Sequence, residues 1–121
     1  MVTWDNVHRE LDEWAASGRV ATLWWRDDDA VSVTPALERG LVLSAGTGTA
    51  VGLAVIPRDA RPELAEHLLS VPTAFVLLHG FGHVNHAPPG AEQDEYGPHR
   101  PLDTRLAELA EGRNRLTGFP R

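Results

Sequence analysis

Three of the chain's six histidines lie in the segment 77–86, which reads LLHGFGHVNH. In an extended strand the first two, His79 and His83, would lie roughly 13 Å apart at about 3.3 Å per residue. That is too far to share one zinc ion, whose ligands lie about 2.1 Å away. The glycines between them permit a sharp turn, and one helical turn would bring both imidazoles to the same side, where His86 could also reach. The pattern therefore predicts a metal site, and the alternative is a polar turn that closes a strand.

A run of three carboxylates, Asp27 to Asp29, follows Arg26 further upstream. Two carboxylates about 4 Å apart repel each other by roughly 1 kcal/mol in water and by about 4 kcal/mol at an effective dielectric constant of 20. Such a run requires a cation, an arginine or full solvation. Arg26 supplies part of the balancing charge, and a divalent metal could supply more. The alternative is a solvated acidic turn or helix cap.

The hydrophobic pattern predicts elements that would bring both polar clusters to one edge of a sheet. Strands are expected at 20–25, 50–56 and 73–78, and helices at 3–17, 34–46, 61–69 and 103–116. Each strand is a continuous apolar run, which is typical of a parallel sheet covered by helices, here in βαβαβ order. The aspartates would then follow the first strand and His79 the third, at the carboxyl ends where such folds bind ligands.

The remaining segments complete a single expected α/β domain over residues 1–121. Residues 79–101 show no periodicity, and a loop of this length is commonly functional. Asn85 and Tyr96 in this loop are further candidates for lining a site. Trp24 and Trp25 are expected in the core, and the alternative is that they stack against a sugar. Trp4 and Trp14 are expected on the packing face of the first helix.

The composition limits the classes of partner. A net charge of -6 and the absence of basic runs argue against nucleic acid and against a membrane surface. There is no apolar stretch of transmembrane length, and the polar, acidic N-terminus does not resemble a secretory signal. Because the chain has no cysteine, a metal would be held by histidine, carboxylate or backbone oxygen. We expect a cytoplasmic protein.

The two polar clusters together resemble the polysaccharide deacetylases of the NodB-homology type, carbohydrate esterase family 4. The resemblance is carried by Arg26-Asp-Asp-Asp29, by His79-Gly-Phe-Gly-His-Val-Asn-His-Ala-Pro-Pro-Gly90 and by Glu95-Tyr-Gly-Pro-His-Arg-Pro101. It covers roughly residues 20–117 and is similar to a bacterial branch of that family.

The resemblance implies a deformed (β/α) barrel and a divalent metal, usually zinc. It implies that His79 and His83 are metal ligands, that Asp29 is the third ligand and that Asp28 is the general base. The other register, with Asp27 as base and Asp28 as ligand, stays open because the run has three aspartates. The family's reaction is the hydrolysis of an N-acetyl group on carbohydrate, in which the metal polarises the carbonyl and activates water.

The family's later motifs, which include a histidine general acid, have no counterpart in this chain. His99 and Arg100 are present, but no motif makes them substitutes. The chain therefore resembles the N-terminal half of such a domain, and we expect a fragment, a shortened natural form or a protomer that pairs with a second copy. Three functions follow: a metal-dependent deacetylase, a non-catalytic metal- or carbohydrate-binding domain, and an α/β interaction module whose polar clusters are solvated loops.

Overall fold

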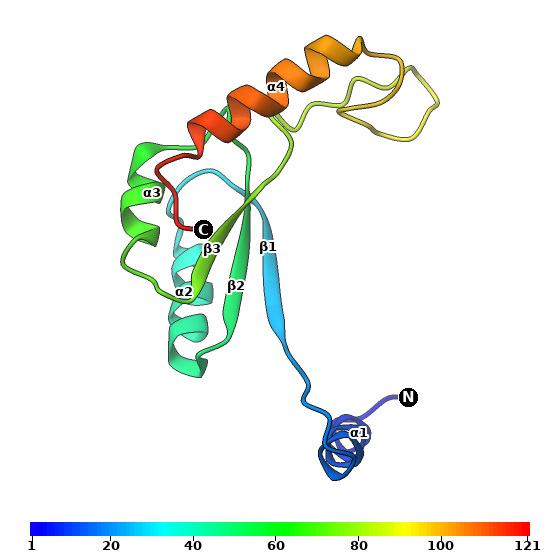
Figure 1. Cartoon of the computed structure of the whole chain (residues 1–121), viewed down its shortest axis with the longest axis vertical. Coiled ribbons are helices and arrows are strands. Elements are labelled where there is room, and N and C mark those ends of the chain that lie inside the picture. Colours follow the sequence, from blue (N-terminus) through cyan, green and yellow to red (C-terminus); the bar gives the residue numbers. More distant parts are fainter.

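The computed structural model describes residues 1–121 and contains one three-stranded parallel sheet and four helices (Figure 1). In chain order the elements are α1 (Trp4–Ala16), β1 (Trp24–Ala30), α2 (Pro35–Thr47), β2 (Ala50–Val55), α3 (Pro62–Leu68), β3 (Ala74–Leu78) and α4 (Leu102–Arg115). The predicted α/β class and parallel sheet are confirmed. The long segment between β3 and α4 contains no helix or strand, as expected.

The first crossover helix of the sheet follows from local sequence signals. The Thr34 hydroxyl accepts a hydrogen bond from the Leu37 N–H at 3.1 Å, and Pro35 occupies the first turn of α2, where it needs no hydrogen-bonding partner. Gly48 ends the helix with φ +66, a conformation that glycine adopts without steric cost. These signals account for the close agreement between the predicted and the observed helix.

The strands lie in the order β1-β2-β3, so each βαβ connection joins neighbours. Because such crossovers are right-handed, α2 and α3 lie on the same face of the sheet, as Figure 1 shows. The core forms between that face and the two helices. Its buried members are Ala30, Leu37, Leu41, Val51, Leu53, Val55, Leu64, Leu68, Ala74, Leu116 and Phe119.

The opposite face of the sheet carries an aromatic pair. The rings of Trp24 and Phe75 lie 5.8 Å apart, and a Cβ at Gly52 would come within 2.9 Å of both. Trp24 is 52% exposed and Trp25 is 37% exposed, so the prediction that both lie in the core was wrong. The cause is that β1 is an edge strand, with no neighbour on its outer side to exclude water.

The first and last helices are less buried than their patterns suggested. No residue of α1 is buried, and the helix stands away from the sheet, so the predicted packing of Trp4 and Trp14 was wrong (Figure 1). The end of α4 does pack, because Gly112 and Leu116 are buried there. No helix in the structure combines the length and the apolar character needed to cross a membrane.

The segment after α4 runs beside the free edge of β3. The Val76 N–H donates a hydrogen bond to the Pro120 carbonyl at 3.1 Å, and Phe119 is buried in the core. This contact fixes the end of α4 against the sheet. The long loop from 79 to 101 is therefore held at both ends, by β3 and by α4.

Candidate metal centre

The aspartates lie on a β-bulge within β1. Between the pairings of Asp27 and Ala30, β1 has two residues, Asp28 and Asp29, where β2 has one. Asp29 has φ +63, a left-handed conformation that is uncommon outside glycine and that Asp tolerates better than most residues. Bulges of this kind redirect side chains near functional sites. The expected strand ended before the aspartates; in the structure they form its carboxyl-terminal half, which corrects the prediction.

The two histidines come together through a tight turn after β3. The His79 N–H donates to the Val55 carbonyl at 3.0 Å and so continues the strand pairing by one residue. Gly80 with φ +62 and His83 with φ +51 then reverse the chain without forming a helical turn. The two imidazole rings lie 4.7 Å apart at 30° to each other. Asp29 and His83 are the chain's two non-glycine residues with positive φ, so the unusual backbone of this protein is concentrated at this place.

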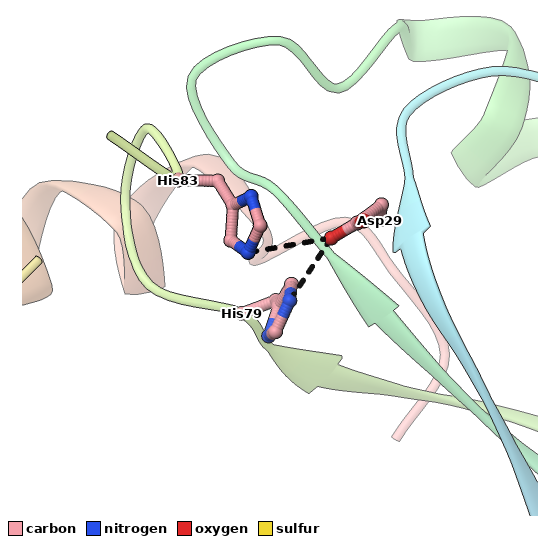
Figure 2. Close-up of side chains that lie close together, drawn as sticks. All are labelled: Asp29, His79 and His83. Atoms are coloured by element: carbon pink, nitrogen blue, oxygen red, sulfur yellow. Dashed lines mark ion pairs between the residues drawn. The ribbon is translucent and has the colours of Figure 1, made fainter. Parts of the chain in front are cut away.

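Asp29, His79 and His83 converge at the carboxyl end of the sheet (Figure 2). The Asp29 Oδ1 atom lies 3.1 Å from His79 Nε2 and 3.6 Å from His83 Nε2, and the three ligand atoms lie within 4.8 Å of one another. Ligands about 2.1 Å from a tetrahedral ion lie roughly 3.4 Å apart, and the two distances from Asp29 to the histidines are close to this value. The Asp29 and His83 side chains are 57% and 50% exposed, which leaves a coordination position open to solvent. The group could hold a divalent metal ion.

Asp28 lies beside this group and is paired with Arg26. Its Oδ1 atom accepts a hydrogen bond from Arg26 Nε at 2.8 Å and forms an ion pair with Arg26 Nη2 at 2.7 Å. The same oxygen lies 3.9 Å from His79 Nε2. Arg26 Nη2 also lies 3.4 Å from His79 Nδ1. A cation on Nε2 would leave the proton on Nδ1, where it cannot accept a hydrogen bond, so Arg26 would then bond to Asp28 alone.

The other candidate residues lie outside the three-residue group. Asp27 points toward α2 and lines a cavity of about 370 Å³ between β1 and that helix. The Asn85 side chain orders the loop, because its Oδ1 atom accepts N–H groups from Ala87 at 2.9 Å and from Asp94 at 3.0 Å. The His86 backbone N–H donates to the Asp94 carbonyl at 3.0 Å, and its side chain is exposed.

Cavities near the site are small. The cavity of about 130 Å³ beside the three aspartates is below the 300–1,000 Å³ typical of small-molecule pockets. The larger cavity of about 370 Å³ is lined by Arg26 and Asp27, but by none of the three converging residues. A ligand would therefore contact the converging side chains from the open solvent side.

Glu95 is a residue of this region to which the sequence assigned no role. Its Oε1 atom accepts backbone N–H groups from Phe81, Gly82 and His83 at 3.2, 2.7 and 3.1 Å. The only signal in the sequence was its place in the third segment that resembles the deacetylases, Glu95 to Pro101. Nothing local indicated that a glutamate twelve residues beyond His83 would contact the turn.

The carboxyl-terminal part of the loop is tied to α4 by Arg100 and Arg105. Arg100 forms a bidentate ion pair with Glu108 at 2.8 and 2.6 Å. It also donates a hydrogen bond to the Glu95 carbonyl at 2.9 Å. Arg105 donates to the Tyr96 carbonyl at 2.9 Å. The Tyr96 hydroxyl is buried without a hydrogen-bonding partner, and burial raises its pKa to about 12. Tyr96 therefore packs within the loop rather than lining the centre.

The Arg100–Glu108 pair predicts a pH dependence of stability. Hydrogen bonds from Arg100 hold the pKa of Glu108 below its ordinary value of 4.5, against the opposing effect of burial. A lowered folded-state pKa stabilises the fold above the unfolded pKa, and this contribution is lost as pH falls through the folded pKa. We expect the free energy of unfolding, measured with urea at about pH 3 to 6, to fall more steeply with decreasing pH in the wild type than in Glu108→Gln. Glu92→Gln, an exposed change in the loop before α4, should follow the wild type. Equal slopes for wild type and Glu108→Gln would contradict the prediction.

Two of the three segments that carry the resemblance to polysaccharide deacetylases contribute to the converging group: the first supplies Asp29, and the second supplies His79 and His83. Their proximity depends on the bulge in β1 and on the turn after β3. Compared with protein-family models, with curated proteins and with solved structures, the chain matches none of them.

Proposed function

We propose that this chain is a metal-dependent, deacetylase-like protein that acts on N-acetylated carbohydrate. One observation carries the proposal: a carboxylate on a bulge and two imidazoles on a tight turn converge at the carboxyl edge of a parallel sheet. The resemblance supports it, because the same three residues are the ligands that it implies. In this proposal the three-stranded sheet corresponds to the first part of a deformed (β/α) barrel.

Asp29, His79 and His83 would hold the metal, and zinc fits them best. One carboxylate oxygen and two imidazole nitrogens form a donor set that zinc accepts in catalytic sites, where the remaining position takes water or substrate. Magnesium and calcium prefer oxygen ligands, so two imidazoles disfavour them. When bound, zinc polarises an acyl oxygen and lowers the pKa of coordinated water.

Asp28 is placed to act as the general base. It lies beside the ligands rather than among them, and its hydrogen bond and ion pair with Arg26 fix the direction of the carboxylate. In amide hydrolysis Asp28 takes the proton of the attacking water as the water oxygen bonds to the acyl carbon. The same carboxyl group returns a proton to the amine nitrogen as the C–N bond breaks. Acetate and the free amino sugar are then the products.

A second candidate function is a non-catalytic metal- or carbohydrate-binding α/β domain. The exposure of Asp29 and His83 favours it, because catalytic centres commonly exclude water from the reacting atoms. The exposed apolar side chains at the start of β1, including Trp24 and the preceding Leu23, would also fit pairing with a second copy of the chain. In this reading the metal site recognises a sugar without cleaving it.

Metal analysis and a hydrolysis assay on the untagged protein test the proposal together. We expect about one zinc per chain after incubation with zinc and dialysis, measured by mass spectrometry of the metal. We also expect release of acetate from N-acetylglucosamine oligomers. Zinc without acetate release would establish the non-catalytic binding domain. A chain that binds no zinc would overturn both readings.

A further inference from the structure

The carboxylate of Glu95 closes the turn that carries the histidines. A single oxygen, Oε1, accepts the N–H groups of three successive residues, Phe81, Gly82 and His83, at 3.2, 2.7 and 3.1 Å. Successive backbone N–H groups that point to one place form a concave anion site. In this chain the anion that fills the site is part of the same loop.

These hydrogen bonds act on the strained part of the turn. His83 has φ +51, and such a conformation persists only where its surroundings determine it. The His83 N–H donates to Glu95, and its side chain points toward Asp29. Without this acceptor, three amides would lose their protein partner, and the turn could relax to conformations that separate the two imidazoles.

Glu95 is itself held from the far side of the loop. Its carbonyl accepts a hydrogen bond from Arg100 at 2.9 Å, and Arg100 also forms an ion pair with Glu108 on α4. On the other side of the turn, the Arg58 N–H donates to the Phe81 carbonyl at 2.9 Å. The turn is thus fixed between the end of β2 and α4, and Glu95 is its link to the helix.

We infer that Glu95 is a positioning residue of the metal centre. It holds His83 in place by accepting hydrogen bonds from three successive backbone N–H groups of the turn. The inference rests on the proposed metal site at Asp29, His79 and His83. Glu95 does not approach the ion; it acts through the backbone of the turn. Groups that support metal ligands in this way typically change metal affinity by about 10- to 100-fold when removed.

Gly80 offers an independent way to displace Glu95. A Cβ at Gly80 would clash with Glu95 Oε2, whereas a Cβ at Gly90 would contact nothing within 4 Å. Both glycines have positive φ, at +62 and +83, so alanine is strained at either position. We expect Gly80→Ala to weaken zinc binding by about 10- to 100-fold and Gly90→Ala to leave it near the wild-type value. Competition titration against a zinc indicator measures both, and equal affinities would contradict the role of Glu95.

The decisive comparison uses Glu95→Ala, Glu95→Gln and the control Glu92→Ala, an exposed residue of the same loop. We expect Glu95→Ala to lower zinc affinity by about 10- to 100-fold and to change the visible spectrum of the cobalt-loaded protein. Glu95→Gln keeps an oxygen acceptor and should restore most of the affinity and the spectrum. Glu92→Ala should match the wild type.

Amide hydrogen exchange in the metal-free proteins separates the failure of this inference from that of the proposed function. We expect faster exchange of the Phe81, Gly82 and His83 amides in Glu95→Ala and little change elsewhere. Wild-type affinity and cobalt spectrum in Glu95→Ala would overturn the positioning role. If the wild type binds no metal, both the proposed function and the positioning role are excluded. The exchange experiment still tests the turn in that case, because unchanged exchange in Glu95→Ala would exclude ordering of the turn by Glu95.

Discussion

His79→Ala and His83→Asn are each expected to lower zinc affinity by more than the roughly 10- to 100-fold lost when a supporting group is removed. Each change removes one of three converging ligand atoms and leaves two, which do not form a stable zinc site on an exposed surface. Asparagine is chosen at His83 because it tolerates φ +51 better than alanine, so the turn keeps its shape. Competition titration with a zinc indicator measures the loss.

Two other histidines of the loop provide matched controls. His86 and His99 are both exposed, and neither belongs to the converging group. We expect His86→Ala and His99→Ala to keep zinc affinity close to the wild-type value. A loss in His86→Ala as large as that in His79→Ala would mean that His86 is a ligand and that the loop folds differently around the ion.

Much of the fold could be predicted because its signals are local. The threonine before α2, the proline in its first turn and the glycine after it mark the helix boundaries in the sequence itself. The apolar run that forms β2 predicts a strand buried on both faces, and the neighbours Leu53 and Ala54, which point to opposite faces, are both fully buried. The placement of the aspartates and His79 at one edge of the sheet then follows from the parallel topology.

The rest depended on contacts that no local pattern encodes. The exposure of β1 reflects the absence of a strand beside it, although its tryptophans are as apolar as those of a core strand. The direction of the Asp29 side chain depends on a bulge, which a run of three identical residues cannot place. Glu95 reaches the turn across a loop with no regular structure, so spacing alone does not connect it to His83.

The three aspartates can be separated by changing each of them to asparagine, which preserves size and tolerates a left-handed backbone. Asp29 alone lies within 3.6 Å of both histidine nitrogens, so Asp29→Asn is expected to lose zinc binding. Asp28 lies beside the ligands, so Asp28→Asn is expected to keep zinc but to lower the rate of acetate release by about 10²- to 10⁴-fold, the usual contribution of a general base. Asp27 lines the cavity near α2, so Asp27→Asn should change neither property.

This series decides between the two registers that the run of aspartates leaves open. Zinc content is measured first, because it distinguishes Asp29 from Asp28 without requiring turnover. If Asp28 were the ligand and Asp27 the base, Asp28→Asn would lose zinc and Asp27→Asn would lose hydrolysis. That outcome would require the bulge to shift by one residue, because Asp29 would have to turn away from His79, from which its carboxylate lies 3.1 Å in the present structure. The bulge and the left-handed Asp29 favour the first register, in which the strained residue carries the ligand and its neighbour, fixed by Arg26, carries the base.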